Sequence, residues 1–237
     1  MDYQDEYLTL NKDLHDSDSQ TKSRSILHIL PKDFRPNSII DIASGSGKIL
    51  IEVSKKLHVQ KVVGIDVSYK IIDIARQNDK GKIASWIPIS IFDYQQSGFD
   101  LVLAIDIVEH IENDRKLLDQ ISSLGSLAVI KVPIEDNPIN RFIMWISRRT
   151  IDPWKETEKR YGHIHHYSLE SFINLIQGSD LQIERVEYIH LPRRNKLFWE
   201  VLRILFLPLW FISKKKYIQF NGGFVVTLVK SKKYGKT

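Results

Sequence analysis

Short apolar runs alternate with longer amphipathic stretches along the first half of the chain. The short runs are rich in isoleucine and valine, as is typical of buried parallel strands, and occupy residues 39–42, 61–66, 83–91, 99–105 and 126–132. Between them, apolar residues recur at helical spacing in residues 48–57, 69–77 and 114–124. This alternation predicts a parallel sheet with helices on both faces, whose strands end at one ligand-binding edge.

The first strand runs into a turn of small residues, and a helix follows at once. Because glycine lacks a Cβ, Gly45 and Gly47 let the backbone turn sharply and approach a ligand at the helix N-terminus. A phosphate-binding P-loop is excluded, since Ile42 and Ile49 stand where its first glycine and its hydroxyl residue belong. A dinucleotide fingerprint lacks its third glycine, which is Leu50 here. A site for a nucleoside cofactor without pyrophosphate stays open, as does a turn that binds nothing.

Acidic residues stand near the ends of the first three strands. Asp66 ends the second strand, where its carboxylate can accept hydrogen bonds from both hydroxyls of a ribose. After the third strand, Ile91 can pack on an adenine ring and Asp93 can accept from its exocyclic amine. Asp41 can face a cationic amino group. These positions predict a site for a nucleoside that carries an amino group.

The second half of the chain departs from this alternation. Residues 133–167 are aromatic and charged with weak periodicity, and such a long segment within a compact domain is often a functional lid. A helix at residues 168–177, with Ser168 as its N-cap, and strands at 181–189 and 223–229 follow. Residues 195–213 between these strands are too apolar for a helix with a single buried face. They can cover an acceptor site, form a dimer surface or lie on a membrane. The fourth interpretation, a buried core helix kinked at Pro208, is about as favoured as the other three together.

Composition is that of an ordinary globular protein, with 237 residues of which 43% are hydrophobic and 27% charged. The absence of cysteine excludes disulfides and thiol chemistry, and the acidic N-terminus is not a secretory signal, so we expect a cytoplasmic protein. Residues 3–14 are weakly patterned and predict a loosely held arm. The net charge of +5 is concentrated after residue 193, where a basic region binds an anionic partner or is simply solvated.

Four successive motifs resemble those of a known family. They are residues 40–47, residues 63–66 (Val-Gly-Ile-Asp), residues 99–103 and residues 108–111 (Val-Glu-His-Ile). Together they resemble class I S-adenosylmethionine-dependent methyltransferases, and residues 162–168 resemble the subgroup that includes ubiquinone-pathway O-methyltransferases. The resemblance covers roughly residues 38–189 and departs at Ala43, where the family usually has glycine. The family's third-strand position matches either Asp93 or Ser90.

The resemblance implies an α/β, Rossmann-like doubly wound sheet of seven strands, mostly parallel with a C-terminal antiparallel hairpin and helices on both faces. We expect a single methyltransferase domain over residues 1–237, with a lid-like insertion at about 133–167 and a hydrophobic helical insertion at about 193–216. The implied cofactor is S-adenosyl-L-methionine. The residues expected to bind it are Asp41, Ala43, Ser44, Gly45, Gly47, Asp66, Val67, Ile91, Asp93 and Ile105.

Catalytic candidates follow the fourth strand and the predicted lid. Asp106, Glu109 and His110 fall at i, i+3 and i+4, so a helix would place them on one face toward the methyl donor. That face can supply a general base or, less favoured, hold a divalent cation, whereas Glu109 and His110 can equally brace the next helix. His163, next to Gly162, is the fourth candidate, either beside the acceptor or in a surface turn.

These features together predict a methyltransferase for a small or lipid-like acceptor, with oxygen favoured as the acceptor atom. Two alternatives stay open: a catalytically inactive cofactor-binding partner protein, and a nucleic-acid methyltransferase that uses the basic C-terminal region. Nucleic acid is disfavoured, because the basic residues are interleaved with an aliphatic run rather than with stacking aromatics. Peripheral membrane contact through residues 195–216, the oligomeric state and any metal are left open.

Overall fold

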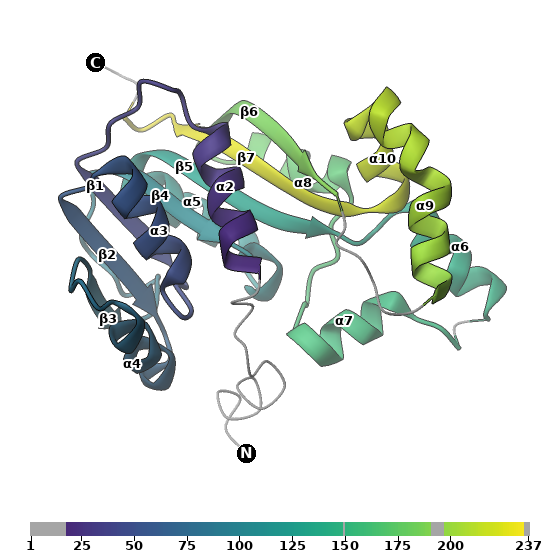
Figure 1. The fold of residues 1–237 in the computed structure, drawn as a ribbon, viewed down its shortest axis with the longest axis horizontal. Coiled ribbons are helices and arrows are strands. Elements are labelled where there is room, and N and C mark those ends of the chain that lie inside the picture. Colours follow the sequence, from purple (N-terminus) through teal and green to yellow (C-terminus); the bar gives the residue numbers. More distant parts are fainter. Residues whose placement is uncertain (1–17, 149, 191–196, 235–237) are drawn as a thin grey trace.

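A seven-stranded sheet forms the centre of the protein, in the order β3-β2-β1-β4-β5-β7-β6 (Figure 1). The computed structural model describes residues 18–148, 150–190 and 197–234. Strands β1 to β5 are parallel, and β7 is antiparallel to both β5 and β6, so the predicted Rossmann-like sheet with its antiparallel hairpin is confirmed. The strands are β1 (Ser38–Ile42), β2 (Lys61–Asp66), β3 (Ser85–Pro88), β4 (Phe99–Ile105), β5 (Gly125–Ile134), β6 (Leu181–Ile189) and β7 (Gly223–Ser231).

Helices cover both faces of the sheet, because successive strand side chains point to opposite sides. Ile39 packs in the cluster beneath one set of helices, and Ile40 packs in the cluster beneath the other. The first set is α2 (Ser19–Ile29), α3 (Lys48–Leu57) and α4 (Tyr69–Asn78), and the second is α5 (Asp114–Leu124), α8 (Leu169–Gln177) and α10 (Lys214–Asn221). Figure 1 shows α2 and α3 in front of the sheet with α5 and α8 behind it.

Residues 133–167 contain more regular structure than their weak periodicity predicts. They include the end of β5, α6 (Pro138–Ile146) and α7 (Pro153–Tyr161). Both helices have proline in the first turn, and both N-caps accept a backbone hydrogen bond, Asn137 from Asn140 and Asp152 from Trp154. Weak periodicity therefore failed to predict these two helices, although the Asn-Pro and Asp-Pro pairs that begin them were visible in the sequence.

Strand β3 is shorter than the predicted 83–91. Its start is delayed because the Asp79 carboxylate accepts hydrogen bonds from the backbone N–H groups of Ile83 (3.1 Å) and Ala84 (3.0 Å), which removes them from the ladder. After Pro88 the chain enters a turn, closed by a hydrogen bond from Asp93 N to Ser90 O at 3.0 Å. Ile91 and Asp93 consequently lie in a turn at the end of β3 rather than in the strand.

Helix α9 (Leu197–Ile212) is inserted between β6 and β7, as predicted, and α10 follows it at once. Phe206, Leu209 and Trp210 pack against the core, whereas Phe211 and Ile212 are exposed. The interpretation as a buried core helix is therefore wrong. No helix in the described residues is long and apolar enough to span a membrane. The predicted arm at residues 3–14 and the start of the predicted 195–213 helix lie outside the described residues.

Candidate active site

The turn after β1 adopts a left-handed backbone at three positions. These are Ala43 (φ 62°), Gly45 (φ 54°) and Gly47 (φ 78°). Ser44 N donates to Ile65 O at 2.9 Å, which ties the turn to β2, and Gly47 is the N-cap of α3. A left-handed conformation costs an L-residue about 1–2 kcal/mol, so Ala43 is strained where glycine would not be.

The two glycines of the turn have different surroundings. A Cβ on Gly47 would overlap the Trp86 ring, whose Nε1 donates to Asp79 at 3.1 Å. A Cβ on Gly45 would meet no atom within 4 Å. Only Gly45 therefore has the open side that a close approach of a ligand requires, and Gly47 is instead required by the packing of an indole.

Two carboxylates lie beside this turn at the ends of neighbouring strands. Asp66 accepts hydrogen bonds from Gly45 N (3.3 Å) and Ser68 N (3.0 Å), and burial raises its pKa against the opposing effect of these bonds. Burial and then the charge of Asp66 raise the pKa of Asp41 well above its usual value. Ser44 Oγ is also buried and has no hydrogen-bond partner among the described residues. The turn thus holds buried polar groups that a cationic, hydroxyl-bearing ligand would satisfy.

The remaining candidates for cofactor binding lie at the carboxyl ends of β2, β3 and β4. Val67 follows β2 and is 60% exposed. Ile105 is the last residue of β4 and is buried, as is Ile91 after β3, whereas Asp93 is exposed. The structure therefore places all the predicted positions along one edge of the sheet, as parallel strands require.

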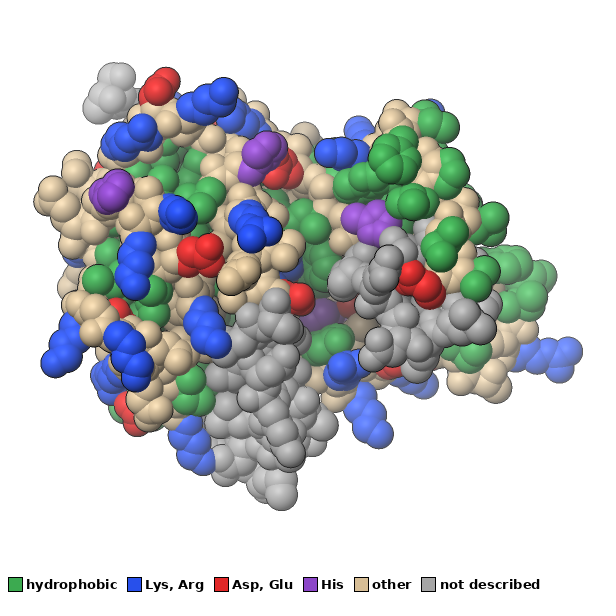
Figure 2. Space-filling model, viewed as in Figure 1, with side chains coloured by type: hydrophobic (Ala, Val, Ile, Leu, Met, Phe, Trp, Pro, Cys, Tyr) green, Lys and Arg blue, Asp and Glu red, His purple; other side chains and the backbone are tan. Residues whose placement is uncertain are grey.

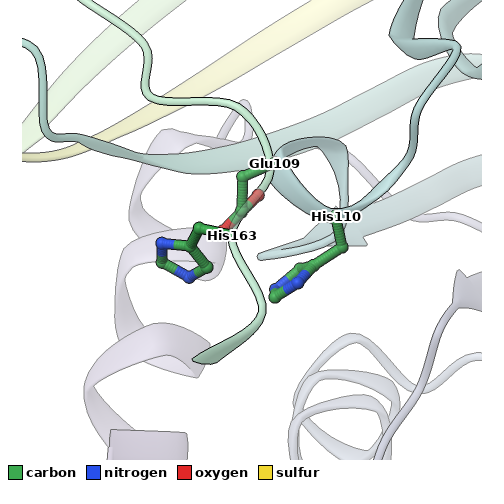
Figure 3. A group of neighbouring side chains, drawn as sticks. All are labelled: Glu109, His110 and His163. Carbon is green, nitrogen blue, oxygen red and sulfur yellow. The ribbon is translucent and has the colours of Figure 1, made fainter. Parts of the chain in front are cut away.

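Glu109, His110 and His163 form a compact cluster beside this edge (Figure 3). Glu109 and His110 belong to the short 3-10 helix η2 (Val108–His110), and His163 follows α7. One carboxylate oxygen and one ring nitrogen from each histidine all lie within 4.8 Å of one another, and the two rings meet edge to face at 5.0 Å. Backbone hydrogen bonds hold the segments together, because Glu109 O accepts from Ile164 N (3.0 Å) and His165 N (3.1 Å).

Burial shapes the acid–base properties of the cluster. Both carboxylate oxygens of Glu109 are buried without a hydrogen-bond partner in the described part of the chain, and burial, then the charge of Asp106, raises its pKa well above the usual value. Burial and then His163 lower the pKa of His110 to about 4, so this imidazole is neutral at pH 7. Its Nδ1 donates to Gly162 O at 3.1 Å, which leaves Nε2 with a free lone pair. His110 thus presents a neutral ring nitrogen that can accept a proton.

Asp106 is not part of a shared helical face, and that expectation is wrong. It has a φ of 54° and precedes η2, so its side chain leaves in a different direction. Its carboxylate pairs with Lys131 and, at 3.0 Å, with Lys22 of α2. Burial acts to raise the pKa of Asp106, but the two lysines outweigh it and hold the pKa well below its usual range. This ion-paired carboxylate cannot accept a proton at neutral pH.

Glu135, at the end of β5, is a site residue that sequence reasoning missed. Its two oxygens accept from His163 Nδ1 (3.0 Å) and His166 Nδ1 (2.8 Å). Burial opposes ionisation, but these two histidines lower the pKa of Glu135 to about 2. A neutral His163 with Nδ1 as the donor would have Nε2 as an acceptor. The signal that could have revealed Glu135 was its position at the end of a strand, since it directly follows β5 just as Asp66 ends β2.

The cluster could also hold a divalent cation. One carboxylate and two imidazoles suit a borderline transition metal such as zinc, manganese or iron. The set differs from the predicted one of two carboxylates and one imidazole, because His163 takes the place of Asp106. The unpartnered Glu109 carboxylate is consistent with an added cation, and equally with a protonated acid.

Comparison with known proteins gives a family and a set of related folds. The profile of the family described as "Methyltransferase domain" matches residues 15–186. A putative methyltransferase in complex with the Haloferax volcanii Trm112 methyltransferase activator is similar over 93% of both chains, with 14% identity and a TM-score of 0.66. The plantazolicin methyltransferase BpumL in complex with SAH is similar over 94% of this chain and 89% of its own, with 18% identity and a TM-score of 0.60.

A third solved structure is an S-adenosylmethionine-dependent methyltransferase from Mesorhizobium loti. It is similar over 87% of this chain and 96% of its own, with 19% identity and a TM-score of 0.59. At these identities the likeness to solved structures concerns the fold. The search among curated proteins finds no match.

Proposed function

Because the chain belongs to the methyltransferase domain family, it is an S-adenosylmethionine-dependent methyltransferase, and we propose that it methylates an oxygen of a small or lipid-like acceptor. The observation that carries this proposal is the placing of two chemically different sites at one edge. The turn beside Asp66 follows β1, the Glu109–His110 pair follows β4, and β1 and β4 are neighbours in the sheet. A ligand at this switch point reaches both.

The residues of the turn fit the cofactor. Asp66 would accept hydrogen bonds from the ribose hydroxyls, and Asp41 would face the amino group, whose charge compensates a buried carboxylate. Gly45 would let the backbone approach, since a side chain there meets nothing within 4 Å. When bound, S-adenosylmethionine supplies an activated methyl group on a sulfonium.

The cluster fits the removal of a proton from a weakly acidic hydroxyl. His110 is neutral at pH 7 because its pKa is about 4, and its Nε2 can accept the proton. Glu135 fixes the ring of His163 through a hydrogen bond of 3.0 Å, so that His163 can orient the acceptor. A low basicity limits the driving force of His110, which suits a phenolic or enolic hydroxyl better than an alcohol.

The acceptor class and the ubiquinone-pathway subgroup are parts of this proposal. They are supported by the histidine segment after α7, whose His163 lies in the cluster. The Glu109–His110–His163 set offers a second way to lower the acceptor's pKa, through a divalent cation. A chelator that abolishes turnover, with activity restored by a single added metal, would favour the cation over the histidine base.

The cofactor assignment is tested by calorimetry with S-adenosylhomocysteine. Asp66→Ala removes two hydrogen bonds to a charged acceptor, worth about 1.5–3 kcal/mol each, so we expect affinity to fall more than about 100-fold. Asp73→Ala on α4, an exposed carboxylate paired with Arg76 at 2.9 Å, is the matched control and should bind like the wild type. Equal affinities of the two variants would contradict the ribose assignment.

Turnover is tested with cofactor carrying a labelled methyl group. The acceptors are an alkyl-substituted catechol, a total lipid extract and an RNA oligonucleotide. Label in the catechol or lipid fraction that depends on His110 supports O-methylation of a small or lipid-like acceptor. Label in RNA would instead support the nucleic-acid alternative, and tight cofactor binding without label in any fraction would support an inactive partner protein.

A further inference from the structure

Helices α6, α9 and α10 form one end of the molecule and present an unusual surface. α10 packs against both α6 and α9, so the three helices are one unit. In Figure 2, hydrophobic side chains gather over this end, to the right of the view. The apolar face is defined here as the outward side chains of α6 and α9.

Helix α6 carries two apolar stripes at helical spacing. Ile139 and Ile143 are buried, as a surface helix requires. Phe142, Trp145 and Ile146 lie on the outer side, and Trp145 is 75% exposed. The outer stripe contributes nothing to the core, and its exposure to water is unfavourable.

Helix α9 repeats this arrangement. Phe206, Leu209 and Trp210 form the inward stripe. The outer side chains are Val201, Ile204, Leu205, Phe211 and Ile212. They share one face of the helix because steps of three, four and seven residues relate them, and Phe211 is 81% exposed. Two helices that pack on the same helix α10, each with a second apolar stripe, make a surface built for a partner rather than a few isolated exposed residues.

Basic side chains border the apolar face. Lys214, Lys215 and Lys216 begin α10, separated from Phe211 and Ile212 by the N-cap Ser213, and all three are exposed. The sequences of α6, α9 and α10 contain one acidic residue, Glu200. The partner that fits is therefore apolar inside and negatively charged at its surface.

We propose that the apolar face docks on an anionic lipid bilayer. The outer stripes of α6 and α9 enter the boundary between headgroups and acyl chains, Trp145 lies at the headgroup level, and the lysines of α10 bind lipid phosphates. A second copy of the chain fits less well, because a two-fold interface on this face would bring the lysine clusters of both copies together. The inference concerns a surface and is independent of the acceptor proposed above.

The test is co-sedimentation of the full chain with vesicles of phosphatidylcholine, with and without phosphatidylglycerol. Each lysine near an anionic surface contributes about fivefold in affinity, so Lys215→Gln/Lys216→Gln should weaken binding to phosphatidylglycerol vesicles roughly 25-fold. Phe211→Ser/Ile212→Ser should weaken it at least as much. Lys55→Gln/Lys56→Gln, on the exposed side of α3, removes the same charge elsewhere and should bind like the wild type.

The variants are at exposed positions, and unchanged affinity for S-adenosylhomocysteine shows that they fold. Wild-type protein that does not sediment with phosphatidylglycerol vesicles would overturn the proposal. It would also be overturned if both lysine pairs mattered equally, since binding would then follow net charge and not this face. If analytical ultracentrifugation shows a wild-type dimer, and Phe211→Ser/Ile212→Ser is a monomer, the apolar face would bind a second copy of the chain instead of a bilayer.

Discussion

Gly45 and Gly47 allow one substitution to test two different roles within a single turn. Both residues have a left-handed backbone, so alanine costs about 1–2 kcal/mol of folding free energy at either position. The smaller unfolded-state effect of replacing glycine by alanine, about 0.4–1 kcal/mol, is the same for both variants. Any difference in stability between Gly45→Ala and Gly47→Ala therefore reports what the added methyl group meets.

At Gly47 the methyl group overlaps the Trp86 ring. The ring is buried, and its Nε1 is bound to Asp79, so it cannot move away freely. Overpacking of this kind costs about 1–3 kcal/mol, which raises the total for Gly47→Ala to about 2–5 kcal/mol. At Gly45 the methyl group meets no atom within 4 Å, so the backbone cost of about 1–2 kcal/mol stands alone.

Ligand binding should rank the two variants in the opposite order. The methyl group of Gly45→Ala projects into the space assigned to the cofactor, so we expect affinity for S-adenosylhomocysteine to fall at least about tenfold, or 1.4 kcal/mol. Gly47→Ala should keep most of its affinity where it is folded. Urea unfolding without ligand gives the stabilities, and calorimetry gives the affinities. Unchanged affinity in Gly45→Ala would refute the assigned direction of approach, and equal stabilities would refute the role of Trp86.

Three further predictions concern single groups. His110→Asn should keep cofactor affinity and lose turnover. The pKa of His110 falls from 6.5 to about 4 on folding, so as the pH drops the unfolded chain is protonated at this residue before the folded protein is. The free energy of unfolding of the wild type should therefore fall by up to about 3 kcal/mol between pH 6.5 and pH 4. Urea titrations of His110→Asn should not show this loss. The pKa of Glu109 is raised on folding, so ionisation of its carboxyl lowers the free energy of unfolding as the pH rises above 4.5. Glu109→Gln should therefore be more stable than the wild type at pH 8 by about 1–3 kcal/mol. A less stable variant would contradict the unpaired state of this carboxyl. Ala43→Gly removes the strain of an alanine in a left-handed backbone conformation, for a net gain in stability of about 0.5–1 kcal/mol and a rise in melting temperature of a few degrees. A melting temperature below that of the wild type would show that other contacts compensate the strain.

Local pattern predicted most of the sheet. Strands β2, β4 and β6 and helices α3 and α5 have the predicted bounds, because each is an uninterrupted apolar run or an amphipathic stretch between clear turn residues. The N-cap at Ser168 is confirmed, and its side chain forms a capping box with Ser171. Helix α6 was missed because its outward aromatic residues obscured the period, and α7 because Pro153 is its only buried residue, although Asn137 and Asp152 before proline marked their starts.

The sequence predicted which residues lie near the candidate site, but not which of their side chains pair with one another. Every strand-end residue lies at the expected edge, since parallel strands bring their carboxyl ends together. Two pairings depend on contacts between segments far apart in the sequence. Asp106 forms ion pairs with Lys22 and Lys131, and Glu135 orients His163. No local pattern encodes such contacts, and they decided which of the predicted residues can accept a proton.

The strand order also has a consequence for how the protein is made. Strands β1 to β5 pair with one another, and only β5 pairs in addition with β7, so the half that carries the cofactor turn and η2 can form while the rest is still being synthesised. β6 pairs only with β7, which is the last strand in the chain. The ribosome therefore completes the apolar helix α9 before β7, the partner strand of β6, exists, and this non-local pairing is expected to be the slow step of folding. A chaperone or a nearby bilayer that covers α9 during this interval would protect the chain from aggregation.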